Sequence, residues 1–494
     1  MAAGRAAEHR GGAAWPGLSA ARYLVLLPTA AAVEQTTFNS LRDSLFHCYL
    51  ETRIDMLQGL FLSFLVLLVV LPLGYPQDNL PVCNFLSTVN SLPVSLSEFY
   101  VHANVSYMNS ATLGPMPRAV LRCAVSLWEQ LEQDPLNYYP WKDGQELDEV
   151  RSKSAALLGA DVEEIILTPS TTVALNLVGE GLVSTKYLVP GSNVLTTDQE
   201  HGGGLSWISH WQKFGVIDSV DKISIPYGNE ATIDSCIRVF RNALNAGKNY
   251  SVVFTSHVFT TTGVALPLME IAELVHQHGA LFVVDGAQAV GSLAVNLDAT
   301  GADVYTISAH KWMLAPTGSG ILYIRKGFPQ DAVQPAYMDG GYSAYSASSG
   351  TIPLQTISGL GYAVEMFQNL GLQNVATYNL ELRGKLHYAI TMLVENLVAK
   401  DSRKYAGLRI ISPNQHSMVA SPIVSLNLPI AVISNSDLCS RLLNEYGVIV
   451  KQLADYEGGN DFVFNAIRIT THLFNNEKDI FKLVNGLTHI LLGD

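Results

Sequence analysis

Short apolar runs alternate with stretches of helical periodicity through the middle of the chain. Several of these runs have the length of buried strands: 164–167, 193–196, 251–257, 281–284 and 303–307. From Pro267 to His278 the apolar residues recur at helical spacing, and Gly279 follows as a helix-ending residue. Strands that are apolar on both faces and alternate with helices predict an α/β fold, with a mostly parallel sheet covered by helices.

The last part of the chain has a different pattern. Two or three long helices are predicted from about Leu354 to Lys400, and shorter elements follow: strands near 423–426, 448–450 and 466–470, and helices near 436–446 and from Glu477. This mixture predicts a smaller α+β domain. We therefore expect a large domain over residues 105–360 and a small C-terminal domain over residues 361–494.

The first hundred residues differ again. Residues 1–55 form a low-complexity extension rich in Ala, Gly and Arg, residues 56–75 carry no charge, and residues 76–104 are expected to be a linker. Twenty uncharged residues suit a single-pass signal anchor, a cleaved signal peptide if translation begins at Met56, or a buried core helix. The first two interpretations place the protein in a membrane or the secretory pathway, and the third leaves it in the cytosol.

Composition narrows the functional classes. The chain has 494 residues and a net charge of −13, which argues against nucleic acid as a main partner. Its five cysteines are scattered, and neither a CxxC nor an HExxH motif is present. The sequence therefore predicts neither a disulfide framework nor a metal site.

Polar residues follow several of the predicted strands. Asp285, His257 and His201 each come at or just after a strand end, and Lys311 follows the strand at 303–307. The C-terminal ends of parallel strands meet at one edge of a sheet and build its binding crevice. A lysine between buried strands either snorkels, is paired, or is chemically employed, for instance as a Schiff base with a carbonyl cofactor.

Pyridoxal phosphate is a cofactor that these residues would suit together. Its ring nitrogen needs a carboxylate, which Asp285 offers, and Gln288 lies three positions further on as a donor to the phenolic oxygen. His201 is a candidate to stack on the ring. The phosphate needs hydroxyl groups and a helix N-terminus, which are predicted at Ser170, Thr171 and Thr172, with help from Ser308 and His310.

The segments 283–291 (VVDGAQAVG) and 308–312 (SAHKW) carry a family resemblance. They resemble the class V aminotransferase family of pyridoxal-phosphate enzymes, which includes cysteine desulfurases, selenocysteine lyases, isopenicillin N epimerase and hercynylcysteine sulfoxide lyases. The resemblance covers about residues 105–490. It implies the fold-type I architecture of pyridoxal-phosphate-dependent transferases, an amino-acid substrate, and a homodimer with active sites shared between subunits.

The resemblance also implies roles for individual residues. Lys311 would be the Schiff-base lysine, Asp285 the partner of the ring nitrogen, and Arg468 the group that binds the substrate carboxylate through two hydrogen bonds. The remaining cofactor-binding residues implied by the family motifs are Gln288, His201, Thr171, Thr172, Ser308, His310, Thr260 and Thr351, the last reaching the neighbouring subunit's phosphate.

Two departures from the family bear on the reaction. Residues 447–465 contain no cysteine where desulfurases carry their nucleophile, so we expect no persulfide-forming desulfuration. The segment 259–262 (FTTT) replaces an asparagine of the desulfurases, whereas 109–114 and 135–138 look more like the epimerase and sulfoxide lyase branch.

Several reactions remain open at this point. We expect abstraction of an α-proton by Lys311, ending in C–S β-elimination or in epimerisation, with transamination as an alternative. Epimerisation needs a second acid, for which Tyr138, His257 and a water are candidates. A membrane-anchored, non-catalytic binding protein of the same fold is the alternative from another class.

Overall fold

The protein is described here by a computed structural model that covers residues 91–133, 135, 145–327, 353–453 and 464–493. All of these residues belong to one compact unit. The N-terminal extension, the uncharged segment 56–75 and Thr351 lie outside the described residues.

The described residues form a seven-stranded sheet in the order β2-β8-β7-β6-β5-β3-β4. Its strands are β2 (Ile165–Thr168), β3 (Ser192–Thr197), β4 (Ile217–Ile223), β5 (Val252–Ser256), β6 (Leu281–Asp285), β7 (Val304–Ser308) and β8 (Gly320–Ile324). Among these strands β8 alone runs opposite to the other six. The C-terminal ends of β3, β5, β6 and β7 therefore meet at one edge, as expected for a binding crevice in a parallel sheet.

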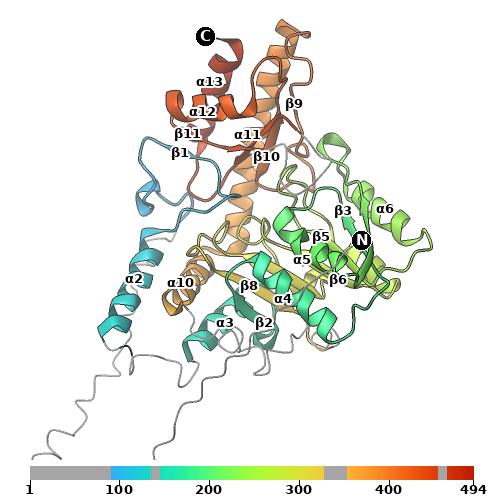
Figure 1. Ribbon diagram of the computed structural model, residues 1–494. Helices are drawn as coiled ribbons and strands as arrows, with labels where there is room; N and C mark the ends of the chain where they lie inside the picture. The colour runs from blue at the N-terminus through green and yellow to red at the C-terminus, as the bar shows by residue number, and fades with distance from the viewer. Residues whose placement is uncertain (1–90, 134, 136–144, 328–352, 454–463, 494) are drawn as a thin grey trace, which may run out of the picture. The chain divides into compact units, whose positions relative to one another are not determined.

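Helices cover both faces of this sheet, and every strand except β4 is therefore buried along most of its length. One face packs on α4 (Thr171–Ser184) and α5 (Gly202–Lys213), which cross in front of the strands in Figure 1. The other face packs on α2 (Arg118–Gln133), α3 (Gln145–Leu158), α6 (Ile233–Leu244), α7 (Leu268–Gln277) and α10 (Leu354–Leu370).

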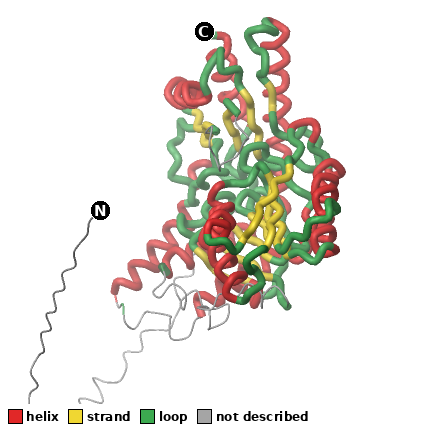
Figure 2. The backbone as a smooth tube through the Cα atoms, turned by 45° about the vertical axis from the view of Figure 1, so that its right-hand side comes forward, coloured by secondary structure: helices red, strands yellow, loops and turns green. Residues whose placement is uncertain are grey.

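A second sheet lies in the C-terminal part of the described chain. It has four strands, all antiparallel, in the order β12 (Lys451–Gln452), β13 (Ala466–Thr470), β10 (Ile423–Asn427) and β9 (Arg409–Ile410). Its own core includes residues of α11 (Leu372–Lys400), α12 (Asn435–Tyr446) and α13 (Glu477–Leu492). Figure 2 shows the two sheets as separate groups of strands. A short parallel pair, β1 (Ser106–Tyr107) with β11 (Val448–Ile449), ties residues near position 106 to this part.

The predicted fold class is confirmed: the central sheet is mostly parallel and is covered by helices. The elements that were not predicted are β4, α5 and α6 and the two-residue strands β9 and β12. Among them, α5 begins at Gly202, directly after His201. The boundary proposed between residues 360 and 361 falls inside α10, and the division into two domains stays a prediction.

The expected membrane segment gains no support from the structure. Across the part of the chain that the structure describes, no helix combines the length and apolar character needed to cross a bilayer. Residues 56–75 were not described, so their role stays a prediction.

Candidate active site

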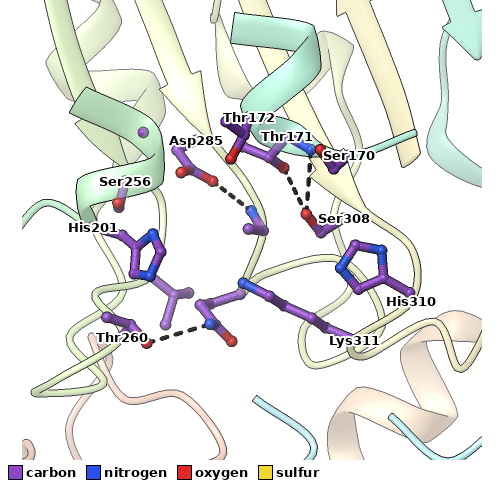
Figure 3. Close-up of a pocket in the computed structure, with 14 residues that line it drawn as sticks. Ser170, Thr171, Thr172, His201, Ser256, Thr260, Asp285, Ser308, His310 and Lys311 are labelled. Carbon is purple, nitrogen blue, oxygen red and sulfur yellow. Dashed lines mark hydrogen bonds between the residues drawn. The ribbon is translucent and has the colours of Figure 1, made fainter. Parts of the chain in front are cut away.

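A cavity of about 200 Å³ opens at the C-terminal edge of the large sheet. Residues from five segments that are distant in sequence surround it, and Figure 3 shows the Lys311 side chain and the His201 ring pointing into it. Its lining residues are Ser170, Thr171, Thr172, His201, Gly204, Ser256, Val258, Thr260, Asp285, Ala287, Gln288, Ser308, His310 and Lys311. The structure thus brings together most of the residues that the sequence singled out.

Lys311 lies in a tight turn that follows β7. The backbone of Gly114 packs against this turn, since its N–H donates to the carbonyl of His310 over 2.9 Å. A Cβ atom at Gly114 would collide with the Lys311 carbonyl oxygen, so only glycine allows this approach. Further along the turn, Leu314 has a φ of 56°, a conformation that costs a leucine free energy and persists only where neighbours hold it.

Asp285 ends β6 and is buried. The N–H of Ala287 donates to its Oδ1 over 2.9 Å. Burial raises the pKa of Asp285, while Lys311, the Ala287 N–H and His201 act in the opposite direction. A protonated ring nitrogen beside this carboxylate would supply a further compensating positive charge.

Glycine is needed opposite this carboxylate. A Cβ atom at Gly204 would lie 3.0 Å from Oδ2 of Asp285 and 3.1 Å from the ring of Phe254. The first turn of α5 therefore packs closely against the Asp285 carboxylate, and only a residue without a side chain allows this contact.

Hydroxyl groups gather where α4 begins. Ser170 caps the helix by accepting from the N–H of Val173, while the Ser308 hydroxyl contacts Thr171 at both its N–H (3.3 Å) and its Oγ1 (3.0 Å). Hydroxyls at a helix N-terminus form a site for an anion such as phosphate.

His310 stands beside this anion site. Its Nδ1 donates to the carbonyl of Ser319 over 3.1 Å, which fixes the ring toward β8. Burial, followed by the charge of Lys311, lowers the pKa of His310, so the neutral ring presents Nε2 as an acceptor. It can donate to a phosphate only when it is protonated.

His201 caps α5 with its own ring, because Nδ1 accepts from the N–H of Gly203 over 3.1 Å. The side chain is otherwise exposed and reaches the cavity. A ring that is oriented through Nδ1 and reaches the cavity is suited to stacking on a planar cofactor.

Gln288, Thr260 and Arg468 form one connected group. The Gln288 Nε2 donates to the Thr260 hydroxyl over 3.3 Å, and a guanidinium N–H of Arg468 donates to the same oxygen. Arg468 also donates to the hydroxyl of Thr112 over 2.6 Å. Its side chain is buried behind Thr260 and does not line the cavity directly.

Of the candidates for a second acid, only His257 lies within the described residues, and it does not line the cavity. The His257 ring is hydrogen-bonded to the Tyr305 hydroxyl over 2.7 Å and is not among the lining residues. Tyr138 lies outside the described residues.

Sequence reasoning missed Ser256, which ends β5 and lines the cavity. Its hydroxyl donates to Glu200 Oε2 over 2.6 Å. The signal was present in the sequence, because Ser256 ends a strand next to the one that ends in Asp285. Glu200, the buried glutamate that accepts this hydrogen bond, does not end a strand, so the sequence pattern did not point to it.

These residues fit pyridoxal phosphate. A lysine, a buried carboxylate and a hydroxyl-lined helix N-terminus face one cavity. The lysine would bind the aldehyde of the cofactor, the carboxylate its ring nitrogen, and the helix N-terminus its phosphate.

Comparison with known proteins gives consistent matches. Residues 107–480 match the family described as "Aminotransferase class-V". A probable cysteine desulfurase of Chlamydia trachomatis is 30% identical over 361 residues, or 69% of this chain and 83% of the relative. Isopenicillin N epimerase of Amycolatopsis lactamdurans is 25% identical over 78% of this chain and 95% of the relative.

Solved structures show the same fold. The cysteine desulfurase of Thermococcus onnurineus superposes with a TM-score of 0.65 and 21% identity, covering 81% of this chain and 97% of that one. The cystine C–S lyase C-DES, in complex with its reaction product cysteine persulfide, gives 0.65 and 21%, covering 78% and 98%.

These matches correct one expectation. We expected a lyase or epimerase and excluded persulfide-forming desulfuration, because residues 447–465 contain no cysteine. The exclusion is wrong, since the matching relatives include cysteine desulfurases. None of the residues that fit the cofactor is a cysteine. The absence of a cysteine from residues 447–465 therefore does not distinguish this chain from the cysteine desulfurases.

Proposed function

Because the chain belongs to the class V aminotransferase family, whose cofactor is pyridoxal 5′-phosphate, we propose that it is an enzyme that removes the α-proton of a sulfur-bearing amino acid and cleaves its Cβ–S bond. The observation that carries the proposal is the convergence of Lys311, Asp285 and the hydroxyls at the start of α4 on one cavity. The relatives named cysteine desulfurases support sulfur in the substrate.

The cofactor would be held at three points. Lys311 would bind its aldehyde carbon, Asp285 its ring nitrogen, and Thr171, Thr172 and Ser308 its phosphate. When bound, pyridoxal phosphate supplies an electron sink for the charge left at the substrate's α-carbon. Asp285 would keep that sink effective by stabilising a proton on the ring nitrogen.

Two side chains would act on the substrate. The Lys311 amine reaches into the cavity, where it would take the α-proton and later return it to a leaving group or product. Arg468 would bind the α-carboxylate. Since its guanidinium now donates to the hydroxyls of Thr260 and Thr112, the carboxylate would have to replace at least one of these partners.

Epimerisation is the second candidate reaction. It is favoured by the match to isopenicillin N epimerase, which extends over 95% of that relative, and by the segment 109–114. Lys311 would serve one face of the α-carbon, and an additional acid would have to serve the other.

A panel of amino acids incubated with the enzyme in heavy water tests the proposal. Pyruvate with ammonia, or alanine with enzyme-bound sulfur, from cysteine or cystine would support C–S cleavage. Deuterium at the α-carbon with inversion would instead establish epimerisation. A keto acid that retains the substrate's side chain, formed without ammonia, would establish transamination. Protein that binds no cofactor and turns over no amino acid would overturn the proposal in favour of a non-catalytic binding protein.

A further inference from the structure

The turn that carries Lys311 is hydrogen-bonded to a residue that follows a strand of the four-stranded sheet. His472 follows β13 and is completely buried. Its Nε2 donates to the carbonyl of Trp312 over 2.8 Å, and its Nδ1 accepts from the N–H of Leu473 over 2.7 Å. These two bonds require one neutral tautomer, with the hydrogen on Nε2. Burial lowers the pKa of His472 to about 4, so this tautomer persists at neutral pH.

The Trp312 carbonyl, which accepts the hydrogen bond from His472, belongs to the residue next to Lys311. It lies inside the turn that holds Leu314 at a φ of 56°. A strained turn relaxes unless its surroundings hold it. His472 supplies a donor to this buried carbonyl and also packs against the Trp312 indole at a tilt of 40°, with ring centroids 5.2 Å apart.

Trp312 also links the Lys311 turn to Gln288 through a hydrogen bond. Its buried indole N–H donates to Oε1 of Gln288 over 2.7 Å. An indole N–H can only donate, so the Gln288 amide must turn its oxygen toward Trp312. The Nε2 atom then faces the carbonyl of Ala111, at 2.9 Å, and the cavity residue Thr260.

We propose that His472 and Trp312 are positioning residues: His472 holds the Lys311 turn in its strained conformation, and Trp312 transmits that constraint to the Gln288 amide. Strand β13 carries Arg468 as well as leading into His472. One hydrogen bond thereby sets the position of the amine relative to the strand that carries the carboxylate-binding guanidinium. This inference rests on the role of Lys311 in the proposed function.

Paired variants separate positioning from bulk packing. His472→Phe keeps a ring but removes the donor, and His472→Gln restores an N–H near the position of Nε2. His387→Phe is the matched control, since His387 is also buried but lies in α11 and contacts Thr391. Trp312→Phe tests the relay from its other end. Its control is Trp207→Phe, because the buried Nε1 of Trp207 has no partner among the described residues.

The readouts are the pH midpoint of the visible absorbance of the bound cofactor, kcat and KM, and thermal unfolding of the apoprotein. We expect His472→Phe and Trp312→Phe to move the midpoint by roughly half a unit or more, as when one hydrogen bond is lost from one protonation state. We expect kcat to fall at least about tenfold, with KM little changed. His472→Gln should restore both values, and neither control should move them.

The possible failures are distinguishable. If wild-type protein shows no visible band from lysine-bound cofactor, the proposed function fails and this inference with it. If the band is present but His472→Phe and Trp312→Phe change only thermal stability, as the controls do, the positioning role is overturned while the proposed function stands.

Discussion

At the scale of single residues, the close contact between Gly204 and Asp285 constrains the carboxylate that would bind the ring nitrogen. A methyl group at position 204 would come 3.0 Å from the Asp285 carboxylate, closer than nearly all real Cβ contacts, and would also press on Phe254. Either the carboxylate or the helix start must shift. We therefore expect Gly204→Ala to weaken cofactor binding by about tenfold or more, which equilibrium dialysis of pyridoxal phosphate against apoprotein measures.

Gly384 provides the control for this substitution. It lies within α11, and a Cβ atom there meets nothing within 4 Å. Alanine is favoured over glycine in a helix by about 1 kcal/mol, so Gly384→Ala should leave cofactor affinity unchanged and slightly raise stability. Equal affinity in the two variants would show that the close approach at Gly204 is irrelevant to binding.

At the scale of secondary-structure elements, a buried glutamate joins two strands beneath the cavity. Glu200 accepts from Thr197 at the end of β3 over 2.8 Å, and from the N–H and hydroxyl of Ser256 at the end of β5 over 3.0 and 2.6 Å. Burial raises the pKa of Glu200 from 4.5 to about 7, against the effect of these hydrogen bonds.

The sign of the resulting pH dependence follows from this shift. The folded pKa is raised, so the stabilising contribution of protonated Glu200 is fully present below pH 4.5 and is lost as the pH rises through about 7. Relative to Glu200→Gln, the free energy of unfolding of wild-type protein should fall by ~3 kcal/mol over that interval. Denaturant titrations at several pH values measure this difference, and a constant difference would contradict it.

The strand ends could be predicted from sequence because they depend on local pattern. Asp285 and Ser308 each close a short apolar run, and Ser170 precedes a helical stretch. The beginning of α5 at Gly202 could not be predicted, because its first three residues are glycines and glycine is a poor helix former. The close approach of Gly204 to Asp285, which accounts for one of these glycines, appears only in the structure.

Contacts between distant segments could not be predicted from the sequence, for a different reason. The burial of Arg468 behind Thr260 depends on how the two sheets meet, and so does the contact of His472 with the Lys311 turn. Periodicity specifies the faces of an element but not its partner. The pairing of β1 with β11, more than three hundred residues apart, is another case.

At the scale of the whole molecule, the resemblance implies a homodimer in which Thr351 of one subunit serves the site of the other. Lys311→Ala and Thr351→Val subunits would then each lack a different part of a shared site. Mixed dimers contain one intact site, so co-expression should restore activity that neither variant shows in full. Activity of the mixture equal to the average of the separate variants would contradict sharing.

The central claim is that Lys311 binds pyridoxal phosphate, and one measurement tests it directly. Borohydride reduction of the wild-type protein with its cofactor, followed by proteolysis and mass spectrometry, should place a pyridoxyl phosphate group on the peptide that contains Lys311. Lys311→Ala should give no adduct there and no visible absorbance band. An adduct on another lysine, or none in the wild-type protein, would contradict the account.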